Sequence, residues 1–91
     1  MRELKLFIEA LEELFTDKNT HFIINKVSTP SRFPAYTNVS LNVYEKTNQS
    51  ETIISTVEET GKTVTAEEKT ELENLIIKKS IKNILEYYGI K

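Results

Sequence analysis

The sequence predicts a single two-layer α+β domain, with an N-terminal helix, a three-stranded antiparallel sheet and a long C-terminal helix in the order α-β-β-β-α. Apolar residues recur at helical spacing near both ends of the chain. The middle of the chain instead contains β-rich and alternating runs, separated by short polar turns. A length of 91 residues corresponds to one domain, so we expect residues 1–91 to fold as one unit.

Residues 2–17 are expected to form the first helix. Their apolar side chains follow i, i+3, i+4, i+7 spacing within an arc of about 120°, and they are Leu4, Phe7, Ile8, Leu11, Leu14 and Phe15. Charged residues such as Lys5 and Glu9 lie outside this arc, where water solvates them. A helix with one apolar stripe is suited to cover one face of a sheet.

Three strands are expected, over residues 21–28, 37–45 and 50–58. The first has large apolar side chains on both faces, as in a central strand or in one whose outer face meets a partner. Residues 29–36 contain both prolines and are expected to be a loop, because Pro lacks an amide donor and disfavours helix at the preceding residue. Short connections favour an antiparallel meander, although a loop of this length leaves the pairing of the first strand open.

Side-chain alternation predicts which strand residues face the core. The middle strand is expected to direct one apolar set to a single face, namely Val39, Leu41 and Val43. In the last strand, Ile53, Ser55 and Val57 are expected to share one face, with Ile54 on the other. Residues 59–62 are expected to form the turn before the last helix.

Residues 65–88 form a long stretch without Gly or Pro and are expected to be the second helix. Thr65 and Glu68 have the spacing of a capping box, in which each side chain accepts from the other residue's amide. Gly89 follows the last periodic residue and suits a left-handed C-cap. Glutamates precede lysines along the helix, which matches its macrodipole.

The apolar residues of this helix fall into two clusters. Leu72, Leu75 and Ile76 gather on one side. The cluster on nearly the opposite side comprises Ile77, Ile81, Ile84, Leu85 and Tyr88. Either the helix bends or breaks near residues 77–80, or its halves bury different faces. In the second case the cover is the first helix of the same chain or another subunit.

The composition argues against catalysis. His21 is the only histidine, Asp17 is the only aspartate and there is no cysteine, so neither a nucleophile–base pair nor a Cys-based zinc site has a sequence signature. Gly61 and Gly89 are the only glycines, which excludes a glycine-rich phosphate loop. We expect a protein that is not an enzyme, with no catalytic residue, cofactor, metal site or small-molecule substrate.

Charge and hydropathy restrict the cellular location of the protein and the classes of molecule that it is expected to bind. Glutamates interrupt the apolar positions near the N-terminus, so we expect neither a signal peptide nor a membrane span. A net charge of -2 provides no general attraction to nucleic acid or to an anionic membrane. The absence of cysteine fits a reducing compartment, and we expect a cytoplasmic protein.

The expected function is that of a small, non-catalytic protein-binding or assembly protein. The expected partner is a protein, and the favoured candidate is a second copy of the chain, joined through the C-terminal helix, the sheet or both into a homodimer. The candidate interface residues are Arg32, Phe33, Tyr36, Leu72, Leu75 and Ile76. Arg and aromatic side chains are enriched at protein interfaces. An alternative is that Phe33 and Tyr36 fold back to cover the sheet edge.

A second hypothesis is a nucleic-acid-binding regulator. It would use the 29–36 loop, where Arg32 and its aromatic neighbours can stack on bases, and the basic end of the last helix. The lysines at that end are Lys78, Lys79 and Lys82. Nucleic acid is the less favoured partner, because four glutamates lie just upstream of these lysines in the sequence.

Overall fold

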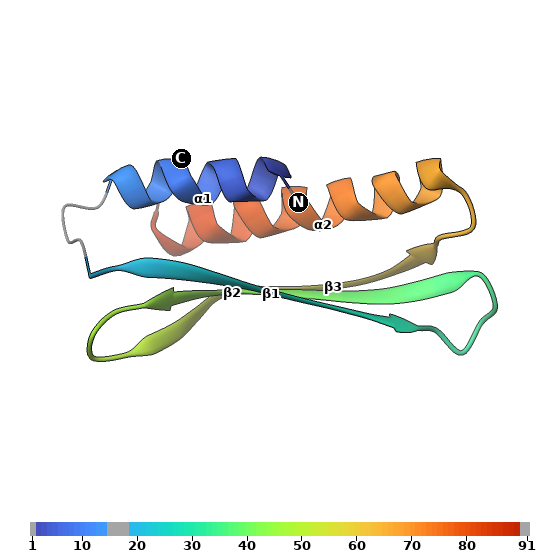
Figure 1. Cartoon of the computed structure of the whole chain (residues 1–91), viewed down its shortest axis with the longest axis horizontal. Coiled ribbons are helices and arrows are strands. Elements are labelled where there is room, and N and C mark those ends of the chain that lie inside the picture. Colours follow the sequence, from blue (N-terminus) through green and yellow to red (C-terminus); the bar gives the residue numbers. More distant parts are fainter. Residues whose placement is uncertain (1, 15–18, 90–91) are drawn as a thin grey trace.

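The computed structural model describes residues 2–14 and 19–89, and it confirms the α-β-β-β-α fold (Figure 1). The elements are α1 (Arg2–Leu14), β1 (His21–Pro30), β2 (Tyr36–Lys46), β3 (Glu51–Lys62) and α2 (Ala66–Tyr87). The strands form one antiparallel sheet in the order β1-β2-β3, which is the expected meander. Both helices lie on the same face of this sheet (Figure 1).

Helix α1 contributes one buried stripe to the core, formed by Leu4, Ile8 and Leu11. Leu14, which the spacing assigned to this stripe, is instead 74% exposed at the last position of the helix. The remainder of the expected helix, residues 15–17 with Phe15, lies outside the described residues. The core contribution of α1 therefore ends at Leu11 within the described range.

The strands are longer than the sequence indicated. β1 continues through Pro30, which pairs with Thr37, and β3 continues through Lys62, which pairs with Tyr36. The expected loop of eight residues is thus reduced to residues 31–35, and the expected turn at 59–62 is part of a strand. Proline is tolerated here because it lies at the end of an edge strand, where a missing amide donor costs little.

A β-bulge reverses the predicted faces at the start of β3. Val43 pairs with Ser55 and Tyr44 pairs with Ile53, so Ile54 has no opposite residue on β2. Ile54 is consequently buried and Ile53 is 54% exposed, the opposite of what strict alternation predicted for these two residues. The prediction was wrong here because a single extra residue shifts a period of two by one position.

Helix α2 is continuous through residues 77–80. Its buried residues are Leu72, Ile76, Ile77, Ser80 and Ile84, and they occupy one arc of about 140°. The two apolar clusters are thus mainly the two flanks of one wide buried surface, with the fully buried Ser80 between them. The sheet and α1 both pack against α2, with β3 as its main contact.

Both ends of α2 carry the expected caps. The Glu68 amide donates to the Thr65 hydroxyl at 3.1 Å, and the Thr65 amide donates to the Glu68 carboxylate at 3.0 Å. Gly89 has a φ of 67°, and its amide donates to the carbonyl oxygen of Glu86. The helix therefore begins and ends where local sequence chemistry indicates.

Candidate functional site

The outer face of the sheet, opposite the two helices, carries an apolar row that crosses all three strands. The pairing places Ile23 beside Tyr44 and Tyr44 beside Ile53. Ile23 is 39% exposed and Ile53 is 54% exposed. We refer to Ile23, Tyr44 and Ile53 as the outer row. In Figure 1 no helix of the described chain covers this face.

The rest of the outer face is mostly polar and has balanced charge. Val27 and Tyr36 are the other exposed apolar residues of this face. Alternation along the strands brings short uncharged side chains to the centre, among them Asn25, Ser40, Asn42 and Thr56. The same alternation brings two lysines and two glutamates to this face, namely Lys46, Lys62, Glu51 and Glu58. The ionic charges of these four side chains cancel.

The turn between β1 and β2 and the first residue of β2 hold three of the predicted interface residues at one end of the sheet. Phe33 is 64% exposed, and its ring meets that of Tyr36 edge-on with centroids 6.4 Å apart. The Lys62 amine lies 6.0 Å from the centroid of the Tyr36 ring. Arg32 is exposed and forms no salt bridge with any described residue. Phe33 therefore remains accessible to a partner instead of covering the sheet edge.

The predicted interface residues of α2 have different environments. Leu72 is 7% exposed and Ile76 is 2% exposed, both within the core of the single chain. Leu75 is 40% exposed. Of the three, only Leu75 presents substantial surface to a partner.

The two regions named for nucleic-acid binding lie apart. The Thr63 amide donates to the carbonyl oxygen of Ala35 at 2.9 Å, so the β1–β2 turn lies beside the start of α2. Lys78 and Lys82 lie roughly 20 Å further along the helix, given a rise of 1.5 Å per residue. Lys79 forms a salt bridge with Glu59 of β3. The structure does not combine the turn and the lysines into one basic surface.

The histidine has an open environment. The His21 side chain is 65% exposed, and its Nδ1 lies 3.8 Å from a carboxylate oxygen of Glu12 on α1. Residues 2–14 and 19–89 contain no group of three His, Cys, Asp or Glu side chains placed to hold a metal ion. Within the same ranges, neither helix is long and apolar enough to cross a membrane.

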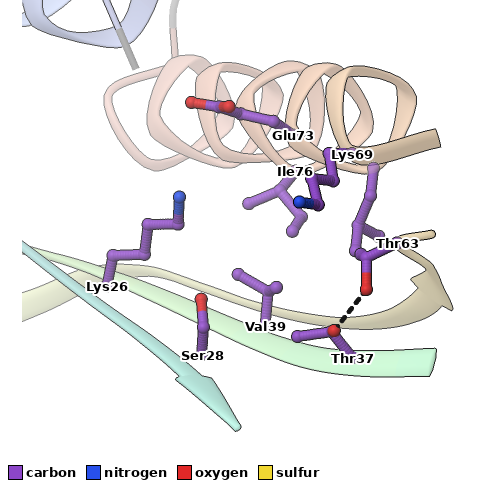
Figure 2. A pocket seen from close by; sticks show the side chains of 9 residues that line it. Lys26, Ser28, Thr37, Val39, Thr63, Lys69, Glu73 and Ile76 are labelled. Atoms are coloured by element: carbon purple, nitrogen blue, oxygen red, sulfur yellow. Dashed lines mark hydrogen bonds between the residues drawn. The ribbon is translucent and has the colours of Figure 1, made fainter. Parts of the chain in front are cut away.

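A groove lies on the inner face of the sheet, between α2 and strands β1 and β2 (Figure 2). Its volume is about 290 Å³, and it is lined by Lys26, Ser28, Thr37, Val39, Thr63, Lys69, Leu72, Glu73 and Ile76. We call it the inner groove. It exists because α1, with 13 residues, spans only about 20 Å, whereas α2, with 22 residues, spans about 33 Å.

Comparisons with known proteins give no relationship for this chain. No family model matches it, and neither the curated proteins nor the solved structures contain a match.

Sequence reasoning missed both the outer row and the inner groove. The apolar residues on both faces of the first strand were visible, but the bulge that exposes Ile53 leaves no sequence signal. A signal for the groove was present in β1. Lys26 and Ser28 occupy positions that pair with the core residues Leu41 and Val39, and polar residues there indicate a stretch of inner face without a helix above it.

Proposed function

We propose that this chain is a non-catalytic protein-binding protein that associates with a second copy of itself through the outer face of its sheet. The observation that carries the proposal is that both helices lie on one face, while the other face presents the outer row to solvent. Antiparallel sheets commonly have one solvated face, but an apolar row across every strand is unusual for such a face.

The distribution of exposed apolar side chains supports this surface. Ten large apolar side chains are exposed among the described residues. Five of them belong to the outer face or to the turn at its end, namely Ile23, Val27, Phe33, Tyr36 and Ile53. Concentration of exposed apolar residues on one face is typical of interaction sites, whereas scattered ones carry no such meaning.

A second copy is the partner that best fits the charge and geometry of this face. Because its lysines and glutamates cancel, two outer faces do not repel each other through net charge. A twofold axis parallel to the strands would stack one outer row on another, with Ile23 of one copy against Ile53 of its partner. Face-to-face sheet packing with nearly aligned strands is a common arrangement.

The size of the face indicates a weak dimer. Strands of about ten residues extend roughly 33 Å, and three strands are roughly 14 Å wide, which gives a footprint near 450 Å². A standard interface buries about 800 Å² on each partner. We therefore expect association at micromolar or higher concentrations, and a monomer in dilute solution.

Sedimentation velocity across a series of protein concentrations tests the proposal. The wild-type chain should shift from monomer to dimer, and Ile53→Glu should remain monomeric because a carboxylate would be desolvated in the interface. The matched control is Leu75→Glu, which adds the same charge at an exposed leucine on α2 and should dimerise normally. A monomeric wild type at all concentrations would refute self-association. Loss of the dimer in Leu75→Glu alone would assign it to the helix.

A further inference from the structure

We propose that the inner groove binds a small amphipathic monoanion, specifically a medium-chain monocarboxylate. This site lies on the opposite side of the sheet from the proposed interface and does not depend on it. The groove combines an apolar floor with two lysine amines at its rim, and this pairing fits a ligand that has an apolar chain and one negative head group.

The cationic rim comes from two separate elements. Lys26 extends from β1 and Lys69 from α2, and Figure 2 shows both amines directed into the space between helix and sheet. Neither lysine forms a salt bridge with a described residue. Both ammonium groups can donate charge-assisted hydrogen bonds to a carboxylate placed in the groove.

The floor of the groove is formed by core side chains. Val39, Leu72 and Ile76 line it, and each is at most 7% exposed. The hydroxyls of Thr37 and Thr63 are hydrogen-bonded to each other at 2.6 Å, which leaves their methyl groups to extend the apolar wall. An alkyl chain placed on this floor would remove apolar surface from water on both sides of the contact.

Charge and volume select the ligand class. Glu73 also lines the groove, so a head group with one negative charge meets less repulsion there than a phosphate dianion would. The volume of about 290 Å³ lies just below the roughly 300–1,000 Å³ range of small-molecule sites. The space suits a medium-length alkyl chain, and it is too small for a folded partner.

The test is an NMR titration of the isotope-labelled full chain with sodium octanoate. Saturable shifts should concentrate at the amides of Lys26, Ser28 and Thr63, with a dissociation constant on the order of 1 mM for a ligand of this size. Octyltrimethylammonium and octyl glucoside should give no saturable shifts there. Octanoate shifts that are absent, or that map to the outer face, would overturn the proposal, as would equal binding of either control amphiphile.

Two variants, each with a matched control, test the lysine at the rim of the inner groove and the volume inside it. Lys69→Ala should raise the dissociation constant about twofold to fivefold, whereas Lys82→Ala, the same change at an exposed lysine further along α2, should leave it unchanged. Ser28→Phe should block the groove, and Thr29→Phe, the adjacent position on the opposite face of β1, should not. Equal binding by Ser28→Phe and wild type would overturn the proposal. Groove shifts that appear on increasing protein concentration alone would also overturn it, because they would assign the groove to a second copy.

Discussion

Tyr88, the C-cap residue of α2, connects the end of that helix to the middle strand. Its hydroxyl donates a hydrogen bond to the Glu45 carboxylate, and its ring packs edge-on against Phe22 with centroids 6.4 Å apart. Burial raises the pKa of Tyr88 above its ordinary value, and the hydrogen bond to Glu45 raises this pKa further. One side chain thus holds β1, β2 and α2 together at this end of the molecule.

We expect this contact to make stability depend on pH in the alkaline range. Because the folded-state pKa of Tyr88 is raised, the folded protein keeps this proton where the unfolded chain, with a pKa of about 10, has lost it. The contribution is complete below about pH 10 and is lost as the pH rises through the folded-state pKa. Tyr88→Phe should cost about 1 kcal/mol at neutral pH and should flatten the alkaline decline in the urea midpoint.

Tyr87→Phe is the control for this prediction. Tyr87 is 50% exposed and its hydroxyl has no hydrogen-bond partner among the described residues. The substitution should therefore retain most of the wild-type dependence of the urea midpoint on pH, because Tyr87 makes the smallest contribution to the raised pKa of Tyr88. An unchanged alkaline slope in Tyr88→Phe would show that the hydroxyl does not carry this effect.

At the scale of elements, α2 is positioned by its first turn and by its contact with β3. The capping box of Thr65 and Glu68 satisfies amides at the start of the helix. A Cβ atom added at Gly61 of β3 would lie 3.1 Å from Leu72 Cδ1, so the missing side chain lets the helix approach this strand closely. Further along, Asn83 donates to the Ser55 hydroxyl at 3.3 Å, and Lys79 pairs with Glu59.

We expect Thr65→Ala to reduce the free energy of unfolding by about 1 kcal/mol, because the Glu68 amide loses its acceptor. The control is Thr70→Ala, at an exposed position inside the same helix. That substitution should be neutral or slightly stabilising, because alanine has the higher helix propensity. Urea denaturation followed by circular dichroism measures both. Equal midpoints for the two variants would contradict a stabilising role of the cap.

At the scale of the whole molecule, the fold separates two surfaces by the thickness of one sheet. Both helices lie on the inner face, which leaves the outer row bare, and α1 spans only part of the inner face, which leaves the inner groove open (Figures 1 and 2). The molecule is elongated, with extents of 46 × 23 × 19 Å. The outer row is bare because both helices lie on the other face of the sheet. The inner groove is open because the strands are longer than α1.

Because the two surfaces face opposite directions, we expect changes at one not to affect the other. Ile53→Glu should bind octanoate with wild-type affinity, and Ser28→Phe should dimerise as the wild type does. The double variant should show both defects without additional loss of stability. Sedimentation velocity and the NMR titration, applied to all three variants, measure this. A dimer weakened in Ser28→Phe would show that the surfaces are coupled.

The sequence predicted the fold better than it predicted the candidate site. The two helices, the meander and the caps at Thr65 and Gly89 follow from local periodicity and spacing. For Phe33 the sequence left two alternatives open, an exposed side chain or one folded back over the sheet edge, and the structure shows it 64% exposed. The inner groove was not predicted, because it depends on the length of α1 relative to α2, and the side chains that form it come from four distant segments.

The sequence by itself determined the order and approximate position of the helices and strands, because side-chain periodicity is a local property, although it ended β1 and β3 too early. Only the tertiary structure decided which faces are covered. By sequence alone, Leu72 and Ile76 belong to a second apolar surface, whereas in the structure the buried Ser80 lies between the two clusters and both form one wide contact. Likewise, the bulge that turns Ile53 outward arises from pairing between strands, and such pairing follows from long-range packing that no local period records.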